Sequence, residues 1–195
     1  MDSNVEYYNQ NAESFYDNSV EADMSEWRNN FIKHLPDGGR ILDAGCGSGR
    51  DSKAFIKEGF SVVAFDASRE MCKKASQLLG QEVWQMRFDE MSFDEEFDGV
   101  WACASLLHAN ENELADVFEK IYRALKNNGV LYASFKYGNG VTQRGERIFI
   151  DFTEESIKPY LEKIGFELID SGITTDVRPG REDEKWTNVI AIKRY

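Results

Sequence analysis

The sequence holds few of the residues that build metal centres, membrane spans or nucleic-acid surfaces. Its 195 residues include 2 His and 3 Cys, and Cys46, Cys72 and Cys103 lie far apart without the spacing of metal ligands. No apolar run approaches the roughly 20 residues of a transmembrane helix. Lys and Arg number 23 against 35 Asp and Glu, so the net charge is -12. That charge argues against a nucleic-acid partner held by phosphate contacts and against an anionic membrane surface.

The first residues and the few cysteines also indicate the compartment in which the protein works. Residues 1–6 have neither the basic region nor the apolar core of a signal peptide. An odd number of separated thiols suits a reducing cytoplasm better than a disulfide framework. At this length we expect one domain over residues 1–195, cytoplasmic and either monomeric or homodimeric, with no nucleic-acid or membrane partner.

The most informative stretch is Arg40–Asp51, which reads RILDAGCGSGRD. A short apolar entry, typical of the end of a buried strand, is followed by the carboxylate of Asp43. Gly45, Gly47 and Gly49 then allow a sharp turn and the close approach of a ligand, because no Cβ stands in the way. The residues after the glycines are typical of a helix. Strand, glycine turn and helix together predict a nucleotide-type site at the C-terminal edge of a parallel sheet.

A second acid supports this interpretation. The mostly apolar run Ser61–Asp66 ends where an acid after the second strand would accept the hydroxyl groups of a ribose. The glycine spacing departs from the dinucleotide fingerprint, because Arg50 stands where the third glycine should be. With Asp43 two residues before Gly45, the pattern instead resembles motif I of the class I S-adenosylmethionine-dependent methyltransferases.

The resemblance covers residues 40–195 and implies a fold. Members of that family have an α/β, doubly wound, Rossmann-like sheet of seven strands in the order 3-2-1-4-5-7-6, with strand 7 antiparallel and helices at the flanks. The chain looks similar to the small single-domain enzymes of the tellurite-resistance and thiopurine kind. We expect the strands, in chain order, at residues 40–42, 61–66, 83–86, 97–103, 130–135, 166–173 and 185–192.

The N-terminal segment, residues 1–38, carries too many aromatic residues for a disordered tail. One interpretation is a helical lid that folds over a cofactor and contacts it through Tyr16. The other is an arm packed on the surface of the Rossmann-like core, which we expect at residues 39–195.

The resemblance also implies the cofactor, S-adenosylmethionine, and the residues that hold it. In that family the acid at the position of Asp43 interacts with the methionine amino group, and the acid at the position of Asp66 holds the ribose hydroxyls. Cys103 would lie beside the methyl group as a small buried residue rather than a nucleophile. The cofactor-binding residues implied are Asp43, Gly45, Cys46, Gly47, Gly49, Arg50, Asp66, Ala67, Arg87, Phe88, Cys103 and Tyr16.

The adenine contact departs from the family pattern. An Asp often accepts a hydrogen bond from adenine N6 in that family, but Arg87 stands at its position, followed by Phe88. Since arginine has no acceptor, Asp89 or a backbone carbonyl is left to meet N6.

Candidate catalytic and substrate residues follow the fourth and fifth strands. His108 is the general-base candidate, although many methyl transfers need no strong base. A long glycine-bearing loop at 136–147 carries Lys136, Arg144 and Arg147, and Arg178 lies between the last two strands. These cations would bind an anionic substrate; alternatively they belong to a solvated loop or pair with neighbouring acids.

The last helix begins at Thr153 or at Ser156. Pro159 favours the later start, or a kinked helix, because a start at Thr153 would place proline in the helix interior and remove a hydrogen bond. In the first turn its missing N–H has little consequence.

Three functional hypotheses follow. The first is an S-adenosylmethionine-dependent methyltransferase that acts on a small acceptor, which is anionic if the basic residues meet it. The second is a non-catalytic protein that binds S-adenosylmethionine or S-adenosylhomocysteine. The third is an NAD-dependent oxidoreductase, against which the missing third glycine and the lack of a second catalytic domain count.

Overall fold

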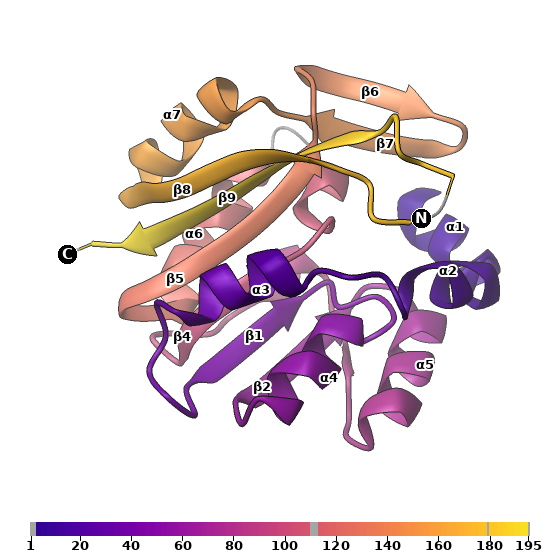
Figure 1. Cartoon of the computed structure of the whole chain (residues 1–195), viewed down its shortest axis with the longest axis horizontal. Coiled ribbons are helices and arrows are strands. Elements are labelled where there is room, and N and C mark those ends of the chain that lie inside the picture. Colours follow the sequence, from indigo (N-terminus) through magenta and orange to yellow (C-terminus); the bar gives the residue numbers. More distant parts are fainter. Residues whose placement is uncertain (1–2, 110–112, 179, 195) are drawn as a thin grey trace.

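Seven strands form a central sheet in the order β3-β2-β1-β4-β5-β9-β8 in the computed structural model, which describes residues 3–109, 113–178 and 180–194 (Figure 1). Neighbours from β3 to β5 run parallel, whereas β9 is antiparallel to both β5 and β8. The expected doubly wound sheet with an inserted antiparallel strand is therefore confirmed. The strands are β1 (Arg40–Ala44), β2 (Ser61–Asp66), β3 (Trp84–Gln85), β4 (Phe97–Ala102), β5 (Leu125–Lys136), β8 (Phe166–Thr175) and β9 (Lys185–Lys193).

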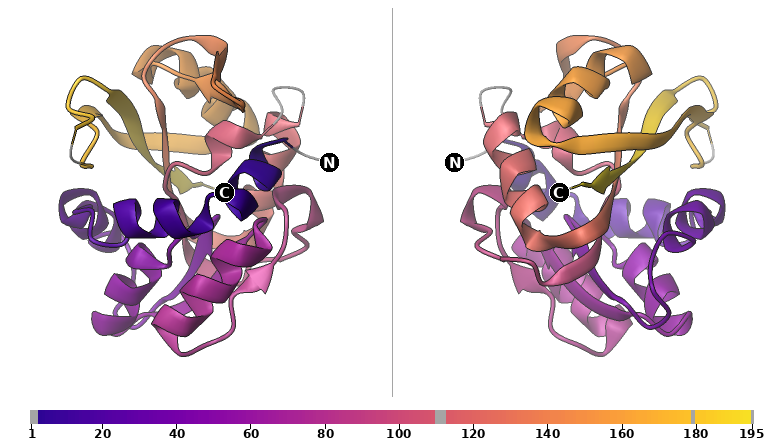
Figure 2. Two further views of the ribbon diagram at one scale, coloured as in Figure 1. Left: turned by 90° about the vertical axis from the view of Figure 1, so that its right-hand side faces the viewer. Right: turned by 90° about the vertical axis from the view of Figure 1, so that its left-hand side faces the viewer.

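Helices cover both faces of the sheet, and each layer encloses its own apolar core (Figure 2). Phe118 and Leu161 belong to one core, whereas Phe31 and Phe55 belong to the other. Within the described residues, every helix is too short or too polar to cross a membrane. The helices are α1 (Ser3–Gln10), α2 (Ala12–Ser19), α3 (Ser25–Ile32), α4 (Arg50–Lys57), α5 (Arg69–Leu79), α6 (Leu114–Ala124) and α7 (Glu154–Ile164), with short 3-10 turns η1 (Phe88–Glu90) and η2 (Leu106–His108).

The three N-terminal helices differ in what they contact. Helix α3 belongs to a core layer, because Phe31 is fully buried with its ring 5.3 Å from that of Trp101. A Cβ at Gly99 would lie 2.5 Å from the Phe31 ring, so β4 approaches this helix closely only because residue 99 is glycine. Of the helices in the segment 1–38, predicted to be a lid, α1 and α2 are therefore the two that are not built into the core and can border a site. Residues 1–2 of this segment lie outside the described part.

Helix α7 begins earlier than predicted. Thr153 Oγ1 accepts the N–H of Ser156 (3.2 Å), and Ser156 Oγ accepts the N–H of Thr153 (2.9 Å). This reciprocal cap stabilises a start at Glu154, so the prediction of a start at Ser156 is wrong and Pro159 lies inside the helix. The missing N–H would have met the carbonyl of Glu155, which is exposed and accessible to water.

The segment after β5 is a β-hairpin rather than the predicted long loop. Its strands, β6 (Gly140–Arg144) and β7 (Arg147–Asp151), pair antiparallel outside the central sheet. Gly145 has φ 63° at the first position of the two-residue turn, as a type II′ turn requires. Figure 1 shows the hairpin on the same side of the molecule as α1.

Candidate functional site

A cavity of about 1040 Å³ lies at the carboxyl ends of β1, β2 and β4. Its walls also include the β6–β7 hairpin and the connection between β8 and β9. Helix α1 spans this region. Asn4 exchanges two hydrogen bonds with the backbone of Ile148 in β7 (3.0 and 3.1 Å), and Asn9 accepts one from Ser68 Oγ before α5 (2.8 Å). The N-terminal helix thereby joins two distant walls of the cavity.

The glycine turn after β1 needs its first glycine. Gly45 has φ 77°, and a Cβ there would lie 2.5 Å from the Cβ of Ser105. The N–H of Gly45 donates to the carbonyl of Phe65 (2.9 Å), and the N–H of Gly47 donates to Asp66 Oδ2 (2.9 Å). These bonds fix the turn against the end of β2, so its backbone forms a bare wall of the cavity.

Asp66 ends β2 and lines the cavity together with Ala67. Besides the N–H of Gly47, it accepts the N–H of Ser68 at Oδ1 (2.8 Å). Burial raises the pKa of Asp66, and these two backbone donors oppose the increase. Each carboxylate oxygen can accept more than one hydrogen bond, so Asp66 retains acceptor capacity for hydroxyl groups in the cavity.

Asp43 is a buried acid at the end of β1, 2% exposed and part of the cavity wall. Ser52 Oγ donates to its Oδ2 (2.6 Å), but no described residue donates to Oδ1. Burial, and after it the charge of Asp51, raises the pKa of Asp43 to about 7. Because Asp43 lines the cavity, its Oδ1 can accept a hydrogen bond from a cationic or hydrogen-bonding ligand there.

Arg50 begins α4 and occupies the place of the missing third glycine. Its Nε and Nη2 donate to the carboxylate of Asp51 (3.0 and 2.6 Å), and Nη2 also lies 3.6 Å from Cys103 Sγ. Burial, followed by the charge of Asp51, raises the pKa of the Cys103 thiol to about 11. The thiol is therefore protonated at neutral pH, which suits a small wall residue and not a nucleophile.

Arg87 and Phe88 both line the cavity beyond β3. The Phe88 ring lies 5.4 Å from that of Phe65 and presents an apolar surface. Arg87 is exposed, and its Nε donates to Asp89 Oδ1 (3.0 Å). Asp89, the predicted alternative acceptor for adenine N6, thus already accepts a hydrogen bond from Arg87 at one of its two oxygens.

Two of the predicted cofactor residues lie outside the cavity wall. The ring of Tyr16 faces α5, with Lys74 Nζ 5.0 Å from its centroid, whereas Phe15 lines the cavity from the same helix. Gly49 has φ 79° and serves the packing of α4, because a Cβ there would lie 3.1 Å from the Cβ of Ala75. Neither position supports the direct cofactor contact predicted for it.

Tyr8, which no motif marks, occupies the centre of a hydrogen-bonded cluster in the cavity wall. Its Oη lies 2.8 Å from His108 Nε2 and accepts from Arg147 Nη1 (3.2 Å). His108 Nδ1 lies 3.3 Å from the carbonyl of Ile148, which favours the tautomer with its proton on Nδ1. In that tautomer Nε2 accepts the hydrogen bond of the Tyr8 hydroxyl, and both side chains line the cavity. Burial raises the pKa of Tyr8, although Arg147 counteracts it.

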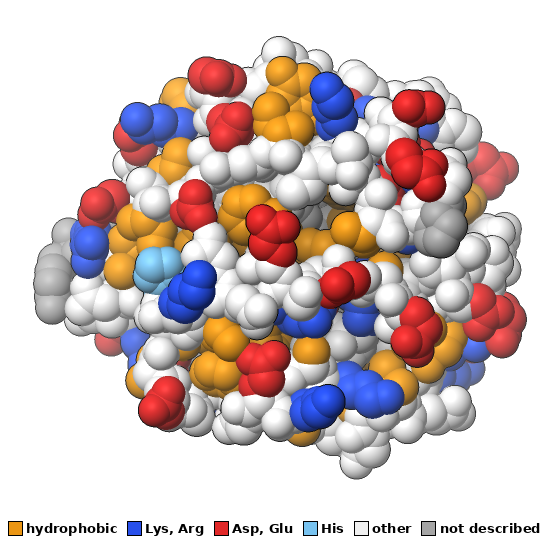
Figure 3. All heavy atoms as spheres, viewed as in Figure 1, with side chains coloured by type: hydrophobic (Ala, Val, Ile, Leu, Met, Phe, Trp, Pro, Cys, Tyr) orange, Lys and Arg blue, Asp and Glu red, His pale blue; other side chains and the backbone are white. Residues whose placement is uncertain are grey.

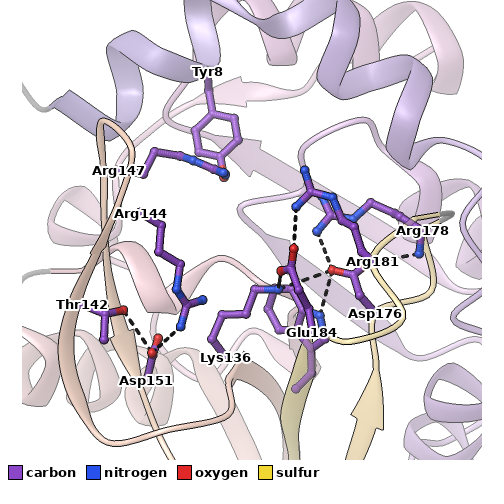
Figure 4. A network of polar contacts seen from close by, with 11 residues as sticks. Tyr8, Lys136, Thr142, Arg144, Arg147, Asp151, Asp176, Arg178, Arg181 and Glu184 are labelled. Carbon is purple, nitrogen blue, oxygen red and sulfur yellow. Dashed lines mark hydrogen bonds and ion pairs between the residues drawn. The ribbon is translucent and has the colours of Figure 1, made fainter.

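Lys136 and Arg178 line the cavity and both contact acids (Figure 4). Lys136 Nζ pairs with Glu184 and lies 3.4 Å from Asp176 Oδ2. Arg178 donates to both oxygens of Asp176 (2.9 and 2.6 Å). Burial alone would raise the pKa of Asp176, but the hydrogen bonds from Arg178 outweigh it and hold this pKa below its usual range.

Arg144 is paired as well. Its Nη2 lies 2.5 Å from Asp151 Oδ2, which also accepts from Thr142 Oγ1 (3.0 Å). Asp151 is 2% exposed, so this ion pair is partly withdrawn from water. The pairing with neighbouring acids, left open by the sequence for Arg144 and Arg178, is therefore confirmed.

Comparisons with known proteins agree with this geometry. Residues 41–129 match the family described as a methyltransferase domain. Over this stretch the chain is therefore similar to methyltransferase domains. YqeM, a methyltransferase of Bacillus subtilis, is 32% identical over 63% of this chain and 55% of its own length, so the chain spans about half of that relative. An uncharacterized methyltransferase of Staphylococcus carnosus is 24% identical over 83% of this chain and 87% of its own length.

Solved structures of methyltransferases share the fold of this chain. The Burkholderia thailandensis 1,6-didemethyltoxoflavin-N1-methyltransferase, with 1,6-didemethyltoxoflavin and S-adenosylhomocysteine bound, has a TM-score of 0.82 at 21% identity, over 99% of this chain and 87% of that one. A TehB-like S-adenosylmethionine-dependent methyltransferase from Corynebacterium glutamicum has a TM-score of 0.69 at 19% identity, over 98% and 99% of the two chains. At these identities the likeness shows the fold alone.

The residues that line the cavity fit S-adenosylmethionine, the methyl donor of such enzymes. The unpaired oxygen of Asp43 suits the ammonium group of the methionine part, and Asp66 suits the ribose hydroxyls. At Gly45 and Gly47 the bare backbone leaves space that a Cβ would occupy. Phe88 offers an apolar surface for a flat base.

Proposed function

We propose that this protein transfers a methyl group from S-adenosylmethionine to a small anionic acceptor. The observation that carries the proposal is the cavity, which runs from Asp43 and Asp66 to the hairpin and the β8–β9 connection. Its volume of about 1040 Å³ lies at the upper end of ligand pockets, which measure roughly 300–1000 Å³. A cofactor and a small acceptor can therefore lie side by side.

The cofactor supplies a methyl group bound to a sulfonium centre, which is a good electrophile. The residues of this chain hold and orient the two reactants. Asp43 would hold the methionine part of the cofactor and Asp66 its ribose, while the N-terminal helix, bonded through Asn4 to the hairpin, would cover them. Orientation of this kind converts an encounter in solution into an effectively unimolecular step, which supplies much of the rate of such a transfer.

The acceptor proton, where one must leave, has a route through Tyr8. The Tyr8 hydroxyl passes its proton to His108 Nε2 as it takes the proton of the acceptor, and the resulting imidazolium donates from Nδ1 to the carbonyl of Ile148. His108 is thus proposed to act as the base through Tyr8 and not by direct contact with the acceptor.

The three predicted substrate-binding cations lie at the far end of the cavity. Lys136, Arg144 and Arg178 all line it. Their acid partners neutralise much of this charge, so these three residues shape and hydrogen-bond the acceptor site more than they attract a charge.

Calorimetric titration with S-adenosylmethionine, S-adenosylhomocysteine and NAD tests the cofactor assignment. We expect binding of both sulfur ligands, no heat with NAD, and affinity at least tenfold lower in Asp66→Asn, because the neutral amide is a weaker acceptor for the ribose hydroxyls. Asp116→Asn, at an exposed position on α6, is the matched control and should bind as the wild type does. Heat with NAD alone would instead favour the oxidoreductase.

A labelled methyl donor separates the enzyme from a non-catalytic binder. Label from S-adenosylmethionine should appear in a small-molecule product when the protein is incubated with a panel of carboxylic acids. Tight cofactor binding without transfer across a broad acceptor panel would support the sensor hypothesis and refute the catalytic one.

A further inference from the structure

Arg147 differs from the three cations discussed above. It lines the cavity from β7, and its Nη1 donates to Tyr8 Oη (3.2 Å). Among the residues that the structure describes, no carboxylate lies within ion-pair distance of its guanidinium. Figure 4 shows Arg147 directed toward Tyr8, apart from the ion pairs around Asp151 and Asp176. One of its five N–H donors is used in the described contacts, which leaves four for a ligand.

Aromatic rings hold this guanidinium in place. Its Cζ lies 4.6 Å from the ring centroid of Tyr7 and 5.1 Å from that of Phe149. The Tyr8 hydroxyl is itself fixed by His108, and the neighbouring Ile148 is tied to α1 through its backbone. The planar fork of Arg147 is therefore positioned before a ligand arrives, which lowers the entropic cost of binding.

The hairpin register adds an electrostatic argument. Arg144 and Arg147 are directly opposite each other across the turn, and like charges at such positions destabilise a hairpin. Asp151 neutralises Arg144, but the charge of Arg147 is left without an acid although the side chain is partly buried. A negatively charged ligand between the hairpin and α1 would remove this repulsion.

We propose that Arg147, held in position by its hydrogen bond to the Tyr8 hydroxyl, binds the carboxylate of a small planar acceptor. The inference rests on the proposed function and names the chemistry of its acceptor. A single acid-free guanidinium matches one negative charge, and its fork matches the two oxygens of a carboxylate. The rings of Tyr8, Phe15 and Phe149 line the same part of the cavity and suit a flat molecule.

A phosphate dianion fits this site less well. Lys136 and Arg178 are already paired with Asp176 and Glu184, so Arg147 offers one positive charge in a chain whose net charge is -12. Acidic side chains are also spread over the face of the molecule seen in Figure 3. A second negative charge would meet repulsion that a carboxylate avoids.

Calorimetry with benzoate, benzamide and inorganic phosphate tests the inference, with and without saturating S-adenosylhomocysteine. Benzamide has the shape of benzoate without its charge, so we expect it to bind the wild type at least tenfold more weakly. Arg147→Gln should lower benzoate affinity by about 10- to 100-fold, the range expected for charge-assisted hydrogen bonds, and leave benzamide unchanged. Arg147→Lys should fall between, because it keeps the charge and loses the fork.

Arg194→Gln is the control, since Arg194 is an exposed arginine paired with Glu167 away from the cavity wall. Unchanged S-adenosylhomocysteine binding in every variant will show that the fold and the cofactor half are intact. If that binding is normal but benzoate affinity does not respond to Arg147→Gln, or if phosphate binds more tightly than benzoate, the inference is refuted and the proposed function stands. If the wild type binds no S-adenosylhomocysteine, the proposed function fails. The benzoate titrations in the absence of S-adenosylhomocysteine still test the role of Arg147 separately.

Discussion

The buried acid Asp43 should make cofactor binding depend on pH. Its pKa is raised to about 7 in the ligand-free protein, first by burial and then by the charge of Asp51, with Ser52 and Arg50 opposing. The proposed partner of the ammonium group of the cofactor is the ionised form of Asp43. Binding should therefore require that the carboxyl group first lose its proton, and affinity should fall as the pH falls below about 7.

The size of the effect follows from the ionised fraction. With a pKa of about 7, about 90% of Asp43 is ionised at pH 8 and about 1% at pH 5. When a ligand binds only one form, the apparent dissociation constant increases in inverse proportion to the fraction of that form. We thus expect binding of S-adenosylhomocysteine to weaken by roughly 90-fold between pH 8 and pH 5, with about 0.9 proton released per ligand at pH 6.

Calorimetry in pairs of buffers with different heats of ionisation measures both quantities. Asp43→Asn should bind more weakly at pH 8 and lose most of the pH dependence, since the amide does not titrate in this range. Asp66, whose pKa is also raised by burial, contributes its own dependence, and Asp66→Asn isolates it. An Asp43→Asn variant that kept the full 90-fold dependence and the same proton release would refute the assignment to Asp43.

The linkage also predicts how stability changes. The folded-state pKa of Asp43 lies above the value of about 3.9 expected in the unfolded chain. The folded protein therefore binds more protons between about pH 4 and pH 7, and the stability that Asp43 contributes is lost as the pH rises through this window. The melting temperature of the ligand-free protein should show this component, and Asp43→Asn should remove it.

Two further substitutions test the backbone. Gly45→Ala should lower S-adenosylhomocysteine affinity by more than tenfold, because φ is 77° and the new Cβ would lie 2.5 Å from Ser105. Gly59→Ala is the control, since Gly59 has φ 94° but nothing within 4 Å of a new Cβ. This control should lower the stability by only about 1–2 kcal/mol and leave the affinity unchanged. Pro159→Ala should raise the free energy of unfolding by about 2 kcal/mol in urea denaturation. The variant restores a helical hydrogen bond, and this gain exceeds the loss from a more flexible unfolded chain. An equally stable or weaker Pro159→Ala protein would show that the helix gains nothing from the restored N–H.

The sheet and the cofactor half of the site could be predicted because their signals are local. Asp43 and the glycines occupy one short stretch, and Asp66 ends the next apolar run along the chain. Parallel strands bring such carboxyl ends to the same edge of a sheet. The insertion of β9 between β5 and β8 came from the family resemblance, since an apolar run does not reveal its neighbours.

The acceptor half could not be predicted because distant segments build it. Tyr8 and His108 lie 100 residues apart, and no spacing rule links α1 to the turn after β4. In the N-terminal segment, adjacent aromatic residues do not reveal which face of the helix borders the cavity. The sequence therefore predicts a cofactor contact for Tyr16, whereas Phe15 lines the cavity. At α7 the stabilisation by the reciprocal cap at Thr153 exceeds the cost of a proline inside the helix. A residue pattern does not show which of these two energies is larger.

The position of β9 has a consequence for the order in which the protein can fold. Strand β8 contacts the sheet only through β9, which is made after it, so during synthesis β8 has no partner and the edge of β5 is open. That edge is long and largely buried in the finished protein, with Val130 to Lys136 paired to β9. Until residues 185–193 emerge, the nascent chain exposes a template for pairing with other chains. Pairing of β9 with both β5 and β8 removes this open edge.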